Sequence, residues 1–327
     1  MSQTIKAIRI HKQGEPSVMQ LEDYALPDPK PGDVRVRHEA IGLNFIDTYH
    51  RSGLYPVPVP SGIGLEAAGV IESLGSGVTD FRIGDRVGYF AGPLGAYAEA
   101  NNVPASRLVR LPAGVTAEQA SALMLKGLTT QYLFRSTYRL KAGETILFHA
   151  AAGGVGLIAC QWAKHLGVTM IGTVGSDEKM ELARENGCHH VINYQKEDVV
   201  ARVKEITGGK GVPVVYDGVG KDTFAMSLDC LSLRGLLVSF GNSSGPVTGV
   251  DLGILAAKGS LYVTRPTLFH YTETRAELDA AADELFDLVA KGIIKPDIRQ
   301  RFDLADAVKA HEALKGRDTV GATILRP

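Results

Sequence analysis

The chain has 327 residues, which is enough for two domains of ordinary size. Its 35 basic and 36 acidic residues give a formal net charge of −1, so it lacks the excess positive charge that draws proteins to nucleic acid or anionic membranes. With 45% hydrophobic and 22% charged residues, the composition is that of a globular protein, not of a fibrous, disordered or membrane-embedded one.

The sequence lacks the usual signals of secretion and membrane insertion. No apolar run reaches the length of about 18 residues that a bilayer requires. Charged residues interrupt the first twenty positions, where a signal peptide would need an apolar core. Cys160, Cys188 and Cys230 are odd in number and widely spaced, which favours free thiols over a disulfide framework. We therefore expect a cytoplasmic protein that does not associate with membranes.

The first part of the chain reads mostly as β-strands. Pro and Gly clusters separate short runs that alternate or are rich in β-branched residues. Such runs cover residues 5–10, 33–38 and 67–74. From residue 126 the pattern changes to strands that alternate with helices. The predicted divisions are a β-rich domain over 1–125, an α/β domain over 126–267, and a segment over 268–327 that returns to the first domain.

The α/β domain contains six short apolar runs typical of buried parallel strands. They cover residues 144–149, 168–174, 191–194, 213–217, 236–241 and 260–264. Helical segments separate the earlier runs; Ser176, for example, can cap a helix over 177–186 that Gly187 ends. Six strands with crossover helices predict a doubly wound parallel sheet. Beyond it we expect a long helix over 274–291 and a last strand over 321–326.

A dinucleotide-binding turn follows the first of these strands. Ala151-x-Gly153-x-x-Gly156 fits the Rossmann fingerprint with Ala in the first place. Gly153 lets the backbone approach a pyrophosphate, and Gly156 lets the helix pack closely on the strand. The N–H groups of the helix N-terminus, which includes Gly154 and Val155, face the phosphates. A tight turn without a ligand is the alternative, but the strand–turn–helix–strand context favours a dinucleotide.

The residue that ends the second strand indicates which dinucleotide binds. NAD enzymes carry an acid about 20 residues past the turn, which binds the ribose hydroxyls, whereas this chain has Gly175 there. The missing acid favours NADPH, whose 2′-phosphate a carboxylate would repel. The expected partners around this strand end are Ser176, Lys179, Tyr194 and Arg317. Alternatively Lys179 and Arg317 are solvated surface charges, and the acids Asp177 and Glu178 oppose a basic pocket.

The end of the fifth strand is the third candidate cofactor segment. In a doubly wound sheet the carboxyl ends of the strands face the cofactor. Phe240, Gly241 and Asn242 follow this strand, so we expect them beside the ribose and nicotinamide. A flexible glycine-rich loop without contacts is the alternative.

Several motifs together resemble the medium-chain dehydrogenase/reductase superfamily. They are Gly64-Leu-Glu66-Ala-Ala-Gly69-Val, Gly84-Asp-Arg-Val87 and the Ala-Ala-Gly-Gly-Val-Gly turn. Three further motifs resemble those of the zeta-crystallin-like branch of NADPH:quinone oxidoreductases. They are Asn44-Phe-Ile-Asp47, Arg51-Ser-Gly-Leu-Tyr55-Pro and Gly241-Asn-Ser-Ser-Gly245. The resemblance covers essentially the whole chain. It implies an α/β protein with a GroES-like catalytic domain, a Rossmann domain and a cleft between them, and a homodimer or tetramer paired through the last Rossmann strand, 260–264.

The zinc ligands of the zinc-dependent members are missing. Where those enzymes have a Cys and a Gly-His-Glu motif, this chain has Asn44 and Gly64-Leu65-Glu66. Independently of the family, all three cysteines lie beyond residue 150 at spacings that zinc sites do not use. No tyrosine begins a Tyr-x-x-x-Lys motif either. A quinone suits such a site, because hydride addition gives an aromatic phenolate and needs less polarisation than a simple ketone.

The resemblance also implies the residues of the cleft. The catalytic candidates are Asn44, Tyr55, Asp47 and Arg265, and Asn44, Lys126 and Thr129 join the cofactor residues Ala151, Gly153, Gly154, Val155, Gly156, Gly175, Ser176, Lys179, Tyr194, Phe240, Gly241, Asn242 and Arg317. Structural roles are the alternatives. Tyr55 can pack in its loop, Lys126 can cap the domain junction, and Arg265 can bridge subunits. For Asp47 we favour the acceptance of a backbone amide over proton transfer.

The leading functional prediction is NADPH-dependent reduction of quinones by direct hydride transfer, without metal or flavin. Reduction of an activated C=C bond in enals or enones is the second candidate. A third is a nucleotide-binding protein with a structural or RNA-binding role, as zeta-crystallins suggest. The balanced charge and the lack of a basic, aromatic strip weigh against RNA.

Overall fold

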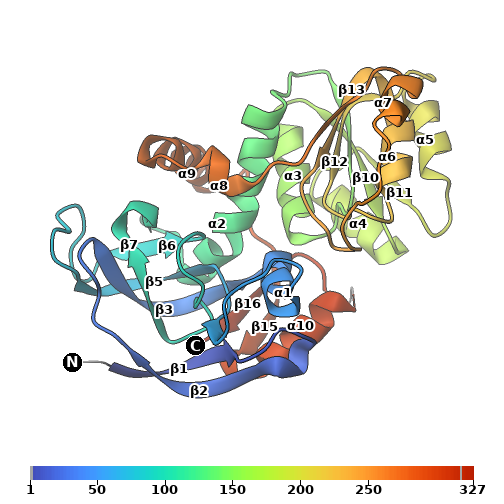
Figure 1. The fold of residues 1–327 in the computed structure, drawn as a ribbon. Coiled ribbons are helices and arrows are strands. Elements are labelled where there is room, and N and C mark those ends of the chain that lie inside the picture. The colour runs from blue at the N-terminus through green and yellow to red at the C-terminus, as the bar shows by residue number, and fades with distance from the viewer. Residues whose placement is uncertain (1–2, 317–318) are drawn as a thin grey trace. The chain divides into compact units, whose positions relative to one another are not determined.

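The computed structural model describes residues 3–316 and 319–327, which form two compact units. Unit 1 combines the chain up to Lys126 with Thr274–Phe286 and the residues from Pro296 on. Unit 2 combines Gly127–Glu273 with Asp287–Lys295. Of the four places where the chain passes from one unit to the other, two lie inside helices, α2 (Ala117–Tyr132) and α9 (Arg275–Ala290), both visible in Figure 1. Neither unit is therefore a single stretch of sequence.

Unit 1 is built mainly from two β-sheets. In its described residues, a seven-stranded sheet has the order β15-β16-β3-β5-β6-β8 with β7 beside β3, and a smaller sheet has the order β2-β1-β4. The strands are β1 (Gln3–Ile10), β2 (Met19–Leu26), β3 (Asp33–Leu43), β4 (Ser61–Gly62), β5 (Glu66–Leu74), β6 (Arg86–Tyr89), β7 (Ala100–Pro104), β8 (Val109–Arg110), β15 (Ile298–Asp303) and β16 (Ala322–Arg326). Val36, Ile41 and Val87 are among the fully buried side chains that hold these strands together.

The end of the chain completes the sheet that the beginning starts. β16 pairs antiparallel with β3, with Leu325 opposite Ile41 and Thr323 opposite Leu43. The helix α10 (Ala307–Lys315) contributes apolar side chains to the same core. The predicted return of the C-terminal strand to the β-rich part is therefore seen in the strand pairing.

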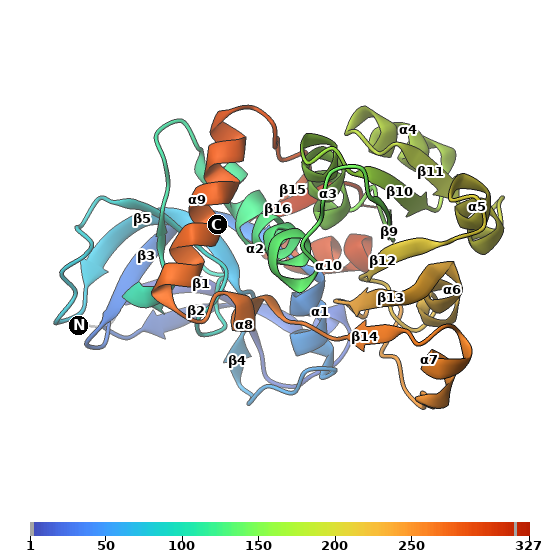
Figure 2. The same cartoon turned by 90° about the horizontal axis from the view of Figure 1, so that it is seen from above.

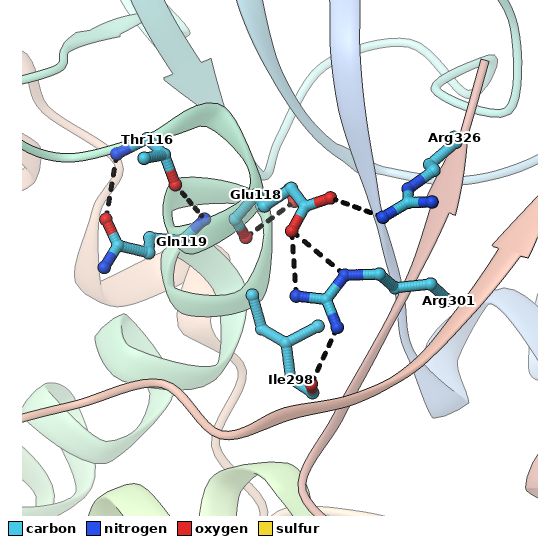
Figure 3. A network of polar contacts seen from close by, with 7 residues as sticks. Thr116, Glu118, Gln119, Ile298, Arg301 and Arg326 are labelled. Carbon is cyan, nitrogen blue, oxygen red and sulfur yellow. Dashed lines mark hydrogen bonds and ion pairs between the residues drawn. The ribbon is translucent and has the colours of Figure 1, made fainter.

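An ion-pair cluster joins α2 to both C-terminal strands (Figure 3). Glu118 of α2 accepts hydrogen bonds from Nε and Nη2 of Arg301 at 3.0 and 2.9 Å, and from Nη2 of Arg326 at 3.2 Å. Arg301 also donates to the carbonyl of Ile298 at 3.1 Å. The hydrogen bond from Arg301 is the main reason why the pKa of Glu118 lies below its usual value.

The helix α1 (Phe45–Ser52) lies in the β-rich part of the chain, where only strands were identified from the sequence. Asn44 is its N-cap, and the Asn44 and Asp47 side chains each bind the other residue's backbone N–H in a capping box. Gly53 ends the helix with a φ of 90°. The helix has 8 residues, little more than two turns, so it has too few positions to produce a recognisable apolar period.

Unit 2 contains the predicted doubly wound sheet. Six parallel strands have the order β11-β10-β9-β12-β13-β14 in the described chain, which is the nucleotide-binding order with its switch point between β9 and β12. The strands are β9 (Thr145–Phe148), β10 (Thr169–Val174), β11 (His190–Asn193), β12 (Val212–Asp217), β13 (Leu231–Ser239) and β14 (Tyr262–Thr264). Ser260 has a φ of 55°, which delays the start of β14 by two residues from the prediction.

Helices cover the two faces of this sheet, as Figure 2 shows from above. They are α3 (Gly154–His165), α4 (Asp177–Glu185), α5 (Val199–Ile206), α6 (Phe224–Cys230) and α7 (Gly253–Ala257), followed along the chain by α8 (Leu268–Tyr271). Leu147, Ile171 and Val215 of the central strands are fully buried, as is Trp162 of α3. In the part of the chain that the structure describes, no helix combines the length and apolarity needed to cross a bilayer.

Candidate active site

The turn between β9 and α3 has the geometry that a pyrophosphate requires. Gly153 is the N-cap of α3, and no described side chain caps it. A Cβ on Gly156 would lie 2.4 Å from the carbonyl oxygen of Ala150, so only glycine lets the helix approach the strand this closely. The Ala151 N–H donates to the carbonyl of Thr173 at 3.0 Å and ties the turn to β10. The first N–H groups of α3 can therefore face an anion.

A buried network that the sequence did not reveal supports this turn. His149, directly before the turn, contacts Thr173 Oγ1 at 2.9 Å through Nδ1 and Ser227 Oγ at 3.0 Å through Nε2. Ser227 donates its proton to Asp217 at 2.8 Å, so it accepts from His149 Nε2–H. Burial lowers the pKa of His149, which keeps the imidazole neutral. The network fixes the carboxyl ends of β9, β10 and β12 relative to one another.

The predicted nicotinamide segment lies against this network. Asp217 accepts from the backbone N–H groups of Val219 and Gly220, and its own carbonyl accepts from the N–H of Phe240 at 2.8 Å. The Phe240 ring packs on Phe148 of β9, with centroids 5.7 Å apart. Gly241 and Asn242 follow directly. The loops after β12 and β13 thus meet beside the end of β9, as a cofactor-binding sheet requires.

The end of β10 brings together most of the predicted 2′-phosphate residues. A Cβ on Gly175 would lie 2.5 Å from the hydroxyl oxygen of Tyr194, so this hydroxyl lies directly over the glycine. Ser176 is the N-cap of α4, and its Oγ accepts from the N–H of Lys179 at 3.3 Å. Arg317 lies outside the described residues.

A buried polar cluster in unit 1 contains two predicted site residues. Lys126 Nζ donates to Asn44 Oδ1 at 2.7 Å and lies 3.4 Å from Glu66 Oε2. Asn44 Nδ2 donates to the same Glu66 oxygen at 2.8 Å, and the N–H of Leu125 donates to Oε1 at 2.7 Å. Lys126 is only 6% exposed, so its ammonium is buried together with these partners. An ammonium held this way is a fixed positive charge in a low-dielectric site.

Asp47 lies next to this cluster and binds a second set of partners. Its Oδ2 accepts from the Asn44 N–H and from the Tyr97 hydroxyl, each at 2.9 Å. Tyr97 also lies 3.1 Å from Nε2 of His311. Burial raises the pKa of Asp47 to about 7 and lowers that of His311 to about 3. The favoured interpretation, that Asp47 accepts a backbone amide, agrees with this geometry.

The other predicted cleft residues have contacts elsewhere. Tyr55 is half-buried, and its ring packs edge-on against Tyr49 with centroids 5.3 Å apart. Thr129 is buried in α2 within unit 2. Arg265 follows β14 and donates to the carbonyl of Pro266 at 3.1 Å. Asn44, Asp47 and Lys126 are thus the cleft candidates brought together within one unit.

The unit 1 cluster does not fit a zinc ion. Asn44 and Glu66 are bridged by the Lys126 ammonium, which would repel a metal cation. Leu65, which directly precedes Glu66, is buried, and its side chain has no atom that could bind a metal. Over residues 3–316 and 319–327, no three or more His, Cys, Asp or Glu side chains are grouped to hold a metal ion.

Both units match models of known protein families. Residues 30–113 match the alcohol dehydrogenase GroES-like domain, and residues 154–286 match the zinc-binding dehydrogenase family. The first match lies in unit 1. The second begins at Gly154, inside the dinucleotide turn, and covers the helices from α3 to α8 and most of α9.

Whole-chain comparisons narrow the family. The quinone oxidoreductase of Pseudomonas aeruginosa is 61% identical over 323 residues, 98% of this chain and 99% of the relative. The 2-haloacrylate reductase of a Burkholderia species is 46% identical and covers 99% of both chains. The crystal structure of Escherichia coli quinone oxidoreductase complexed with NADPH is 56% identical, with a TM-score of 0.97 over 98% of this chain and 100% of that one. This chain therefore belongs to the quinone oxidoreductase family of the medium-chain dehydrogenase/reductase superfamily.

Proposed function

We propose that this chain reduces quinones with NADPH by direct hydride transfer, without a metal ion or flavin. The observation that carries the proposal is the buried cluster of Lys126, Asn44 and Glu66. It provides a fixed positive charge where zinc ligands would be needed for a less reactive carbonyl. The quinone gains two electrons and one hydrogen as hydride from NADPH, which becomes NADP⁺, and one proton from solvent completes the hydroquinone.

The residues of unit 2 fit NADPH. The uncapped N-terminus of α3 suits the pyrophosphate. Gly175, Tyr194 and Lys179 suit the phosphorylated ribose, because no acid ends β10 and a hydroxyl lies over the glycine. Phe240 and its neighbours suit the nicotinamide end. When bound, NADPH supplies the hydride, and the E. coli relative has been crystallised with it.

In unit 1, Lys126 stabilises the developing phenolate oxygen of the quinone. Glu66 and Asn44 hold the ammonium in position, so little reorganisation accompanies the reaction. The capping box of α1 in turn fixes the backbone of Asn44. Tyr55 is proposed as a hydrogen-bond donor to the second carbonyl, and Thr129 and Arg265 as further contacts of the bound molecules.

The test is steady-state reduction of 1,4-benzoquinone by NADPH with Lys126→Met. The variant removes the charge and keeps the length of the side chain, so kcat/KM should fall on the order of 10²-fold. Lys12→Met, at an exposed lysine of unit 1, is the matched control and should retain full activity. Activity that requires flavin, or that chelators abolish, would contradict direct hydride transfer. Negligible quinone turnover by the native protein would refute the proposal that quinones are the substrate.

Reduction of an activated C=C bond is the second candidate, supported by the 46% identity to 2-haloacrylate reductase. Such substrates also place negative charge on an oxygen conjugated to the reacting carbon, so the same lysine would serve. Rates with 2-chloroacrylate, an enone and benzoquinone under identical NADPH concentrations distinguish the two. A preference for the alkenes by tenfold or more in kcat/KM would make this the main activity.

We further propose that the chain forms a homodimer in the cytoplasm. β14 is an edge strand, and its Tyr262 and Val263 side chains are 61% and 40% exposed. An exposed edge with apolar side chains suits pairing with a second copy. Cys160, Cys188 and Cys230 are buried free thiols, which suits a reducing compartment.

A further inference from the structure

An acid does lie near the end of β10, two positions after Gly175. Asp177 opens α4, in the segment where an NAD enzyme carries the acid that binds the ribose hydroxyls. The structure shows that it is paired: Asn193 Nδ2 donates to Oδ1 at 2.9 Å and Lys196 Nζ donates to Oδ2 at 2.5 Å. The hydrogen bond from Lys196 is the main cause of a lowered Asp177 pKa, so the carboxylate is ionised at neutral pH.

The turn after β11 holds both partners in place. Asn193 is only 2% exposed, and its Oδ1 accepts from the N–H of Gln195 at 3.1 Å. The N–H of Tyr194 donates to the carbonyl of Val174 at 3.1 Å. One short segment therefore delivers the Tyr194 hydroxyl to Gly175 and the ammonium of Lys196 to Asp177 at the same strand end.

The local charge balance depends on Lys196. Asp177 and Glu178 carry two negative charges, and Lys179 and Lys196 carry two positive ones. The next acid, Glu197, forms an ion pair with Arg202. Without Lys196 the segment would present a net negative charge to a 2′-phosphate that itself carries about two negative charges, and Coulomb repulsion would oppose binding.

We propose that Lys196 determines cofactor specificity, because its ammonium neutralises Asp177 beside Gly175 and so admits the 2′-phosphate of NADPH. The inference rests on the proposed use of NADPH and adds a residue to it. With Lys196 removed, Asp177 keeps its hydrogen bond from Asn193 but loses its ion pair, so its negative charge repels the 2′-phosphate and does not oppose the hydroxyls of NADH.

The test compares dissociation constants of NADPH and NADH, measured by calorimetry, for the native protein, Lys196→Met, Asp177→Asn and the double variant. Lys196→Met should weaken NADPH on the order of fivefold, as expected for screened surface charges, and leave NADH nearly unchanged. The double variant should regain most of the NADPH affinity, because neither charge remains. The effect of Lys196→Met should shrink as potassium chloride rises from about 0.02 to 0.5 M.

Lys258→Met is the matched control, since Lys258 also forms an ion pair with an aspartate, Asp229, in unit 2. It should change neither affinity. The inference is overturned if Lys196→Met keeps the native ratio of the two affinities, weakens both cofactors equally, or is not rescued by Asp177→Asn. A native protein that binds NADPH no better than NADH would instead refute the proposed cofactor.

Discussion

The buried carboxyl of Asp47 makes stability depend on pH in an unusual direction. Burial raises its pKa to about 7, and Oδ1 has no hydrogen-bond partner among the described residues. A folded-state pKa above the unfolded value gives stability that is complete below about pH 4 and is lost as pH rises to about 7. Above that range the loss stays constant.

Asp47→Asn should remove this dependence. An asparagine oxygen can still accept from Asn44 and Tyr97, and its amide would occupy the place of the unpartnered oxygen. Relative to the native protein, the variant should gain about 2–4 kcal/mol of unfolding free energy between pH 4 and 8, measured by urea denaturation. A constant difference between the two proteins across that range would contradict the raised pKa.

Gly156 and Gly153 provide a comparison at the dinucleotide turn. A Cβ at position 156 would lie 2.4 Å from a backbone oxygen, whereas one at position 153 would lie 3.3 Å from the same atom. Gly156→Ala should therefore displace α3 and lower the unfolding free energy by about 2–4 kcal/mol, with Gly153→Ala costing about 1 kcal/mol or less. Thermal denaturation of both variants checks which substitution is more destabilising. An equal loss of unfolding free energy would mean that the turn relaxes freely around either Cβ.

Among the elements, the link between α2 and the strands β15 and β16 rests on Glu118. Its lowered pKa means that the ion pairs stabilise the fold above about pH 4.5 and are lost as pH falls below it. Because Arg301 is 37% and Glu118 33% exposed, solvent screens the contacts, and Glu118→Gln should cost no more than about 1 kcal/mol at pH 7.

At pH 3 or in 1 M salt the Glu118→Gln variant and the native protein should unfold with nearly equal free energies. Glu39→Gln, at an exposed strand position, is the control and should have no effect at any pH. Undiminished destabilisation at pH 3 would show that the Glu118 contacts act through packing instead of charge.

The sequence predicted the elements that have local signals. The β9–α3–β10 unit was recognisable because its strands are short and apolar, its glycines have fixed spacing and Ser176 caps the next helix. Helix α1 was not predicted, because two turns are too short to show the apolar periodicity of a helix. The contact between Tyr97 and His311 joins residues 214 positions apart, so no local pattern could indicate it.

The partners of some site residues could not be predicted. Lys126 contacts Asn44 and Glu66, which lie 82 and 60 positions away, and no local sequence pattern indicates these contacts. His149 and Asp217 were not predicted as site residues. Each is a polar residue at the end of a buried apolar strand, and this position was the signal that could have indicated them. Side-chain networks of this kind depend on which strands become neighbours, and that follows from tertiary packing.

For the whole molecule, the proposed dimer can be tested through the two edges of the unit 2 sheet. Val263→Asp places a charge on the exposed face of β14 and should shift the protein towards a monomer in sedimentation-velocity experiments. His190→Asp in β11, the opposite edge, is the control and should leave the assembly unchanged. A Val263→Asp dimer with native affinity would exclude the β14 edge as the interface.

The antiparallel pairing of β16 with β3 has a consequence for synthesis on the ribosome. Residues 33–43 leave the ribosome well before their partners, Ala322–Arg326. The sheet of unit 1 therefore keeps an open edge at β3 until β16 has been synthesised. Unit 2 needs the chain only as far as Lys295, so nascent unit 2 can assemble before β16 emerges and closes the N-terminal sheet.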